Sequence, residues 1–448
     1  MDAAAESSAL PELKDDPKTI HGWCMYDWAN SAYITTAVGL LPIFFAKSVV
    51  GESGTLILGK AYRADTLWGI AVGLAGAISF VCAPVLGAIA DFSSSKRKFL
   101  AFFGYSGALF AMLIYFVRTG DVFLTLFFFL ISQIGFVNGN VFYDAFLPHV
   151  ASEAKMDYVS ARGYAYGYVG GGLQFALALL LISFHEKVGL SAEHAARIGI
   201  ATSGAWWALF TVYVMRFLKE APPTAEMPQK YRGRPAWLGY LSVGIERTWH
   251  TTVRTAQFKH LVLFLLAFMF YNEGIQTVIN MATIYGSEEL HLKSVHLMGT
   301  LLMIQFIAFF GSLGFSKLAD RFGTRRAIVF GLIIWMFVVA YANFLQTTAQ
   351  FYILGAIVGL TMGGTQSLSR SYYGSMIPED ASAEFFGFYT VFTKFSAIWG
   401  PWTYAVVAHL LGARVAISSL IVFFVVGLLL LVMVDEEKAR LCRRAEAF

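Results

Sequence analysis

The amino-acid sequence predicts an all-α membrane protein whose twelve transmembrane helices form two six-helix pseudo-repeats. Three observations lead to this class: a composition poor in charge, twelve long apolar segments, and one polar loop that occurs twice. Of the 448 residues, 57% are hydrophobic and 14% are charged. Because a soluble domain carries about 25% charged residues, most of this chain's surface is expected to face lipid.

Twelve segments are long enough to span a bilayer, whose hydrocarbon core of about 30 Å requires roughly 20 mostly apolar residues. Two links, at 119–120 and 347–348, are so short that a continuous helix is an alternative, but their polar residues favour breaks. The expected spans are 22–47, 66–90, 98–118, 121–147, 162–184, 195–218, 258–285, 295–319, 325–346, 349–376, 383–410 and 413–434.

The longest polar stretch divides the chain into two halves and contains a repeated apolar pattern. Trp237, Leu241, Ile245 and Trp249 recur every four residues, which is typical of an amphipathic helix lying flat on a membrane. A disordered linker with a few aromatic residues is the alternative. The expected organisation is an N-terminal tail, a six-helix bundle, a linker with this helix, a second six-helix bundle and a C-terminal tail, at 1–21, 22–218, 219–257, 258–434 and 435–448.

The distribution of Lys and Arg predicts the orientation of the chain. With the N-terminus inside, 24 of these residues fall in inner segments and 8 in outer segments, while Lys394 falls within a span. Positive charge accumulates on the cytoplasmic side of membrane proteins. We therefore expect a multi-pass protein of the bacterial cell inner membrane with both termini in the cytoplasm.

The loop after the second span recurs after the eighth span. When Asp91 is superposed on Asp320, the basic pairs that follow also coincide, at an offset of 229 residues. Short cytoplasmic loops are often basic, but two copies at matched positions indicate parallel repeats, as in transporters whose halves rock against each other. The residues expected to latch this inner gate are Asp91, Lys96, Arg97, Asp320, Arg321, Arg325 and Arg326.

These paired loops resemble the signature of the major facilitator superfamily. The stretches 26–33, 141–148 and 364–401 resemble its vacuole effluxer subfamily, in a bacterial-type member. The resemblance implies the major facilitator fold, a central cavity lined by spans one, four, seven and ten, and amino acids or short peptides as the substrate class. The chain departs from the family pattern at Phe92, at Ser316 and at Glu273.

Charged residues within the apolar segments are the first candidates for a site, because each costs about 2.5–3.5 kcal/mol at the bilayer centre. Glu273 lies near the middle of span seven, and Gln276 and Asn280 follow on the same helical face. Lys394 lies equally deep in span eleven. We expect this group to bind substrate or the coupling ion. A structural ion pair between Glu273 and Lys394 is the alternative.

A second group of polar residues lies nearer the expected inner face. For these residues a gating role competes with substrate binding, and Arg370 is a candidate partner of either aspartate or, alternatively, an interfacial anchor. The group comprises Asp27, Asn30, Tyr33, Asn140, Asp144, Gln366 and Arg370.

The motifs that are missing narrow the function. The sequence has no Walker loop, no dinucleotide fingerprint, no nucleophile elbow and no metal-ligand spacing, so we expect neither an enzyme nor a cofactor or metal. The leading hypothesis is a monomeric secondary transporter that moves a small polar organic solute by alternating access, with protons as a candidate coupling ion and no nucleic-acid partner. The alternatives are a transporter or flippase of an amphiphile, such as a lipid or a siderophore-like molecule, and a non-transporting membrane receptor.

Overall fold

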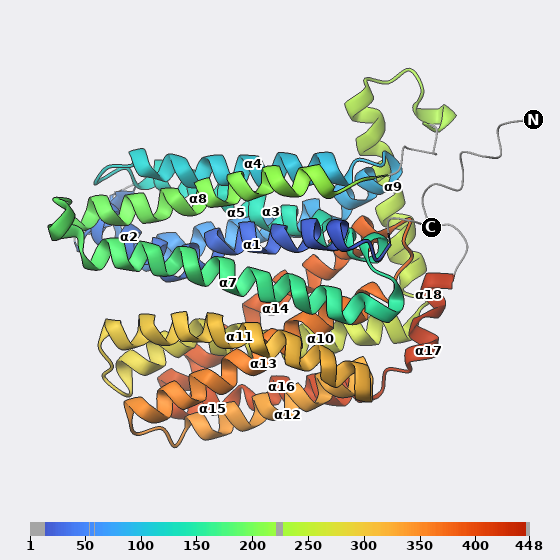
Figure 1. Cartoon of the computed structure of the whole chain (residues 1–448). Helices are drawn as coiled ribbons and strands as arrows, with labels where there is room; N and C mark the ends of the chain where they lie inside the picture. Colours follow the sequence, from blue (N-terminus) through green and yellow to red (C-terminus); the bar gives the residue numbers. More distant parts are fainter. Residues whose placement is uncertain (1–13, 53, 58, 221–226, 445–448) are drawn as a thin grey trace, which may run out of the picture.

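The computed structural model consists of long helices and one small hairpin, and describes residues 14–52, 54–57, 59–220 and 227–444 (Figure 1). Parts of the predicted tails and linker, at 1–13, 221–226 and 445–448, lie outside the described residues. The helices of the first half are α1 (Pro17–Gly39), α2 (Leu41–Phe44), π-helical η3 (Phe45–Val50), α3 (Ala64–Phe92), α4 (Lys96–Leu113), η4 (Ile114–Phe116), α5 (Val122–Ala145), α6 (Leu147–Val150), η5 (Glu153–Lys155), α7 (Met156–Ser183), η6 (His185–Val188) and α8 (Ala192–Phe217).

The second part of the chain is also helical. Its helices are η7 (Gln229–Tyr231), α9 (Ala236–Thr255), α10 (Lys259–Glu288), α11 (Ser294–Phe322), α12 (Thr324–Ala342), α13 (Thr348–Gly374), α14 (Ser382–Leu411), α15 (Ala413–Ser419), α16 (Ile421–Val432), α17 (Glu436–Ala439) and α18 (Leu441–Arg444). The hairpin pairs β1 (Thr55–Ile57) with β2 (Lys60–Tyr62) in antiparallel register.

The all-α membrane class is confirmed. Among the described residues, ten helices are long and apolar enough to cross a membrane, and α1 with the bent segment after it would be an eleventh. The 30-residue helix α14 is not among them, although it lies where the eleventh span is expected. The chain is therefore a multi-pass membrane protein.

The first span differs from its expected form. It begins at Pro17 because Asp16 accepts a hydrogen bond from the backbone N–H of Thr19 at 2.8 Å and caps the helix. It then bends by 41° after Gly39, where Pro42 cannot continue the helical hydrogen-bond ladder. The expectation of one continuous segment over 22–47 is thus wrong at both ends.

The two short links are true breaks, for different local reasons. Gly120 has a φ of 89°, in the left-handed region that favours glycine, and it lies between η4 and α5. Thr347 forms a capping box with Gln350 at the start of α13. Neighbouring helices can therefore reverse direction within a few residues.

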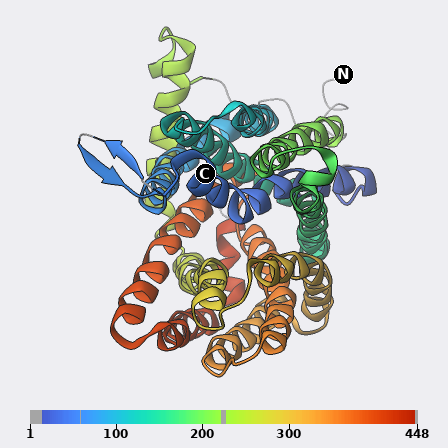
Figure 2. The ribbon, with the colours of Figure 1, turned by 90° about the vertical axis from the view of Figure 1, so that its left-hand side faces the viewer.

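The two halves of the chain form two groups of helices. In Figure 1 the blue-to-green helices α1–α8 lie above the yellow-to-red helices α10–α16, and Figure 2 shows the same division from one end. The groups meet where α7 packs on α11 and α3 packs on α14. We call the end of the bundle that holds α9, α17 and α18 the terminal end, and the opposite end, near α2, the distal end.

Helices α3 and α14 approach each other closely near the terminal end. A Cβ atom added to Gly87 would lie 2.3 Å from the carbonyl oxygen of Ala383. A side chain would not fit at this position. Because glycine has none, the backbones of the two halves can touch here.

Replacing Gly87 with valine should separate α3 from α14 and destabilise the protein. Overpacking of a well-packed contact costs about 1–3 kcal/mol. The matched control is Gly73→Val on the same helix, where an added Cβ would meet nothing within 4 Å. Thermal unfolding of the purified proteins should show a lower Tm for Gly87→Val than for Gly73→Val. Equal Tm values would contradict the close contact.

Candidate functional site

A cavity of about 570 Å³ lies between the two halves of the protein. Its lining extends from Arg370, toward the terminal end, to Gly39, Leu297 and Phe351 at the distal ends of α1, α11 and α13. The volume is in the range typical of small-molecule sites. The cavity therefore has the size and the position expected of a solute site between two rocking halves.

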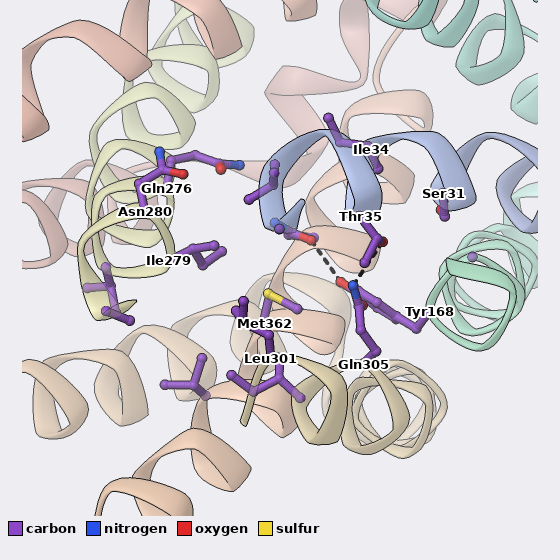
Figure 3. Close-up of a pocket in the computed structure, with 18 of the residues that line it drawn as sticks. Ser31, Ile34, Thr35, Tyr168, Gln276, Ile279, Asn280, Leu301, Gln305 and Met362 are labelled. Atoms are coloured by element: carbon purple, nitrogen blue, oxygen red, sulfur yellow. Dashed lines mark hydrogen bonds between the residues drawn. The ribbon is translucent and has the colours of Figure 1, made fainter. Parts of the chain in front are cut away.

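Polar side chains from both halves line this cavity. Figure 3 shows Ser31, Thr35 and Tyr168 on one side and Gln276 and Asn280 on the other, with apolar side chains between them. The polar lining residues from the first half are Asp27, Asn30, Ser31, Thr35, Gln133, Asn140, Asp144, Tyr164 and Tyr168. Those from the second half include Gln276, Asn280, Thr300, Gln305, Gln366, Arg370, Thr390, Thr393 and Lys394.

Uncharged side chains form a hydrogen-bonded network along the cavity. Asn30 Nδ2 donates to Asn140 Oδ1 at 2.7 Å within the first half. Two further bonds connect the halves. Tyr168 donates to Gln366 Oε1 at 2.8 Å, and Gln305 Nε2 donates to Thr35 at 3.0 Å (Figure 3). Tyr33 is buried behind this wall, where its hydroxyl is 3.3 Å from Gln133 Oε1.

Arg370 of α13 reaches three helices of the other half. Its Nη1 lies 3.2 Å from Asp27 Oδ2 and 3.0 Å from Asp144 Oδ1. Its Nε and Nη2 donate to the hydroxyl and the carbonyl oxygen of Ser160, each at 2.9 Å. Arg370 is only 2% exposed. This one guanidinium therefore ties α13 to α1, α5 and α7 in a site with little access to water.

Aromatic rings surround the same guanidinium. Its central carbon lies 4.2 Å from the ring centre of Tyr164, 4.9 Å from that of Trp23 and 5.3 Å from that of Tyr143. A cation over an aromatic face is stabilised by the ring quadrupole. Tyr143 also donates to Asp27 Oδ2 at 2.7 Å. We call Asp27, Asp144, Ser160 and Arg370, with these three rings, the arginine cluster.

The residues of the expected polar stripe on α10 do not all lie at the cavity. Gln276 and Asn280 line the cavity, but Glu273 does not, and it is 2% exposed. Glu273 Oε1 instead accepts a hydrogen bond from the backbone N–H of Gly400, directly before Pro401, where a proline disrupts the helical ladder of α14. The placement of Glu273 in the cavity is therefore corrected: its contacts hold α10 against α14.

Lys394 lines the cavity on α14. The structure places the carboxylate of Glu273 against Gly400, and the structural pair between Glu273 and Lys394 stays a prediction. Its ammonium group is a candidate ligand for an anionic group of a solute.

Asp91 forms the contact between the halves at the terminal end. Its side chain is fully buried, and Oδ1 lies 2.6 Å from Lys96 Nζ. The same carboxylate accepts hydrogen bonds from the backbone N–H groups of Ala383 at 3.2 Å and Glu384 at 2.8 Å. These groups begin α14, so Asp91 caps a helix of the other half, where a negative charge is favoured by the helix dipole. We call this contact the Asp91 latch.

The other residues of the expected gate behave differently. Arg97 Nη2 donates to the carbonyl of Met215 within the first half, and the backbone N–H groups of Lys96 and Arg97 donate to Glu220 at 2.8 and 2.9 Å. Burial raises the pKa of Glu220. In the second half, Arg325 donates to the carbonyl of Val434.

The remaining gate candidates are exposed, and none of them forms an ion pair with a described residue of the first half: Asp320, Arg321 and Arg326. The residue that receives the second loop is Asp157 of α7, which accepts hydrogen bonds from Thr324 at 2.6 Å and from Ser371 at 2.5 Å. Among the described residues, the first loop inserts its own aspartate into the other half, whereas the second loop bonds to an aspartate of α7. The latch role of Asp320, Arg321 and Arg326 stays a prediction.

The two ends of the described chain also connect the halves. Glu379, in the link between α13 and α14, contacts Lys14 at 2.6 Å and Arg443 at 2.8 Å. Arg440 and Arg443 of the last helices pair with Glu153 of the first half. Single exposed ion pairs contribute about 0–1 kcal/mol, but a network across one surface contributes more reliably.

Two helical halves that enclose a solute-sized cavity and are latched together at one end define a secondary transporter of the major facilitator type. The E. coli fucose:proton symporter FucP has this fold, with a TM-score of 0.67 at 14% identity, covering 93% of this chain and 98% of that chain. The proton:xylose symporter XylE gives a TM-score of 0.66 at 13% identity, covering 92% and 93%. At these identities the likeness shows the fold alone.

The chain belongs to the family described as vacuole effluxer Atg22 like, which matches residues 15–443. The uncharacterized MFS-type transporter YxiO of Bacillus subtilis is 37% identical over 431 residues, which cover 95% of this chain and 96% of that protein. Autophagy-related protein 22 of Coccidioides immitis is 23% identical over 494 residues, covering 86% and 81%. Autophagy-related protein 22-1 of Penicillium rubens is 26% identical, but spans 63% of this chain and 50% of the relative.

Several residues of the site were not expected from the sequence. Gln305 is a single amide in the apolar run of the eighth span, and this isolation is a signal that identifies it. Tyr164 and Tyr168 lie four residues apart on one face of α7, among glycines, which is a weaker signal. Ser160 and Asp157 carry no signal, because serine and aspartate are common at helix starts.

Replacing Arg370 with methionine should strongly destabilise the protein, because Asp27 and Asp144 would lose the guanidinium that pairs with both of them. Breaking a buried ion pair by removing one partner costs about 3–5 kcal/mol. The matched control is Arg414→Met, which removes the half-exposed pair with Glu289 at 2.9 Å. Thermal unfolding should give a clearly larger fall in Tm for Arg370→Met. A fall no larger than that of Arg414→Met would contradict the role of the arginine cluster.

Proposed function

We propose that this secondary transporter moves a small polar organic solute, of the amino-acid or short-peptide class, across a bacterial inner membrane by alternating access. The observation that carries the proposal is a cavity shared by both halves and bounded at the terminal end by contacts between those halves. Arg370 and Asp91 provide those contacts. A solute that enters from the distal end would reach the polar residues and meet a closed barrier beyond them.

The charges around the cavity support a zwitterionic solute. The arginine cluster contains two carboxylates and one guanidinium, so it carries one more negative than positive charge. Asp144 keeps 18% of its side chain exposed and lines the cavity, where it can receive an ammonium group. Lys394 lines the same cavity and can receive a carboxylate. Asn30, Asn140, Gln276, Asn280 and Gln366 can hydrogen-bond the rest of such a solute.

Opening the terminal end would require breaking both barriers. Arg370 would withdraw from Asp27 and Asp144, and α14 would leave Asp91. Two carboxylates without a cation are costly in a site of low dielectric, so a proton is the proposed coupling ion that neutralises one of them. Asp320, Arg321, Arg325 and Arg326 are proposed to act after this step, at the opened terminal end, since they do not hold the closed one.

An amphiphile is the second candidate substrate, and one specific observation favours it. The cavity extends into the second half between α10, α12 and α13, where its lining is apolar: Val338, Val339, Leu345, Leu354, Val358, Met362 and Ile417. A solute with a charged end and a bulky apolar part would contact the polar lining with its charged end and this apolar region with the rest.

Flux measurements in proteoliposomes test the proposed solute site. A thermal-shift screen of amino acids, short peptides and zwitterionic lipids identifies the solute, and radiolabelled uptake is then measured between pH 5.5 and 8. Lys394→Ala and Asp144→Asn should reduce uptake about ten-fold or more, because losing one partner of a buried charged contact costs about 2 kcal/mol or more and about 1.4 kcal/mol is a factor of ten. Lys187→Ala, at an exposed distal residue, is the control.

Wild-type uptake by both Lys394→Ala and Asp144→Asn, over the whole pH range, would overturn this site. Uptake of lipid alone would favour the amphiphile. Glu273→Gln should lower the Tm more than it lowers uptake per folded molecule, because Glu273 contacts the backbone of α14 rather than the cavity.

We propose that the terminal end faces the cytoplasm, as the distribution of Lys and Arg predicts. This orientation predicts which residues are accessible from outside the cell. A cysteine at Lys187, near the distal end, should react with a membrane-impermeant maleimide in intact cells, in a background without Cys24, Cys82 and Cys442. A cysteine at exposed Lys438, near the terminal end, should react only after the cells are opened. The reverse pattern would place the terminal end outside.

A further inference from the structure

Helix α9 occupies an unusual position for a linker. In Figure 1 it runs steeply across the long helices at the terminal end, and both views show its first turns extending beyond the neighbouring helices of the first half (Figures 1 and 2). Since the long helices cross the membrane, a helix with this direction at their end lies along the plane of the membrane surface. Its position is therefore that of an interfacial helix.

One face of α9 is fixed to the transporter. Val243, Gly244, Thr251 and Thr255 are buried there, and the helix packs on α3. A Cβ atom added to Gly244 would lie 2.6 Å from Cγ1 of Ile89, so the backbone of α9 touches α3 directly. The helix is held in one orientation, and the direction of its opposite face is set by the fold.

A different face of α9 presents an apolar stripe that the described protein does not cover. Trp237 is 67% exposed, Ile245 55%, Trp249 69% and Val253 50%, and Leu241 lies between the first two at 39%. These five residues recur every four positions over the whole helix, so each lies about one turn from the next and together they form a strip that winds gradually around the helix. Leaving such a strip in water is costly, at about 25 cal/mol for each Å² of apolar surface. We call these five residues the α9 stripe.

A polar strip lies beside the α9 stripe. Glu246 pairs with Lys230, and it accepts a hydrogen bond from the hydroxyl of Tyr231 at 2.8 Å. His250 follows one turn later and is exposed. The helix thus has a packed face, an apolar face and a water-facing edge, which is the arrangement of a helix at a boundary between water and lipid.

We propose that the α9 stripe inserts into the interfacial zone of an anionic bilayer. Three observations select this occupant. The helix that carries the stripe packs on the membrane span α3, whose surface further along the same helix includes exposed Phe80 and Val81. Tryptophan, present at Trp237 and Trp249, is the side chain that favours the headgroup level. Residues 227–257 contain five Lys or Arg and one acidic residue, a balance that attracts anionic headgroups.

This placement connects the membrane surface with the Asp91 latch. Arg247 of α9 lies 3.8 Å from Glu384, the residue whose backbone N–H is held by Asp91. Insertion of the α9 stripe would hold α9 down on α3 and α14 at the point where the halves meet. Anionic lipid is therefore expected to favour the latched form.

Spin labels on the full-length protein test the insertion. After replacement of Cys24, Cys82 and Cys442, a single cysteine is labelled at Leu241 or Ile245 in the stripe, or at His250 on the water-facing edge. The proteins are placed in nanodiscs of phosphatidylcholine alone or with phosphatidylglycerol. Accessibility to oxygen relative to a water-soluble nickel chelate should be several-fold higher at 241 and 245 than at 250, and higher still with phosphatidylglycerol.

Three results would overturn the inference. Equal accessibility at 241, 245 and 250 would show that the stripe is in water. Spin–spin broadening between labels at 241 in nanodiscs that hold two molecules would identify a second copy as the occupant. Equal immersion in the two lipid mixtures would remove the preference for anionic lipid. Leu56, an apolar residue 76% exposed in the hairpin, is a control for apolar exposure without insertion.

Discussion

The arrangement of the two halves depends on one buried positive charge. Arg370 is removed from water in a membrane protein, where an isolated guanidinium is very costly, and its position is acceptable only because two carboxylates, a serine and three rings of the other half surround it. Those partners belong to α1, α5 and α7. In the closed form the charge of α13 is satisfied by that surface, so the electrostatics of one residue favour one way for the halves to meet.

At the Asp91 latch a buried charge is again satisfied in part by the other half, but by two backbone N–H groups in place of charged side chains. Asp91 is fully buried, and its charge is shared between Lys96 of its own half and the first N–H groups of α14. Both barriers therefore use a charge from one half and donors from the other, and they lie beside buried apolar residues of both halves. The polar contacts can be exchanged for water when the halves separate.

Much of this could be predicted from the sequence, because lipid imposes simple rules. Apolar length gave the positions of the long helices, and the breaks at Gly120 and Thr347 followed from local turn and capping chemistry. Charge within or at the ends of apolar segments drew attention to Asp27, Asp144 and Arg370, but left a gate, a solute site and an interfacial anchor open as their roles. The contacts of single side chains could not be predicted, because they depend on how the helices pack and on where each side chain points. Helical periodicity assigned Glu273 to the face of Gln276 and Asn280, but only packing shows that its carboxylate bonds to Gly400 of α14. Likewise, similarity between loops predicted two equal latches, but similarity cannot show that Asp320 stays exposed while Asp157 receives the second loop.

The unequal count of charges in the arginine cluster has an electrical consequence. A zwitterion that crosses the membrane alone carries no net charge, so its movement is indifferent to voltage. Under the proposed proton coupling, a proton that crosses with the proposed zwitterion, on the carboxylate that lacks a cation of its own, would carry one charge through the field, worth about 2.3 kcal/mol per 100 mV. The ratio of two aspartates to one arginine would then make accumulation of the solute depend on the membrane potential as well as on the pH difference, so that a cell with no pH gradient could still drive it.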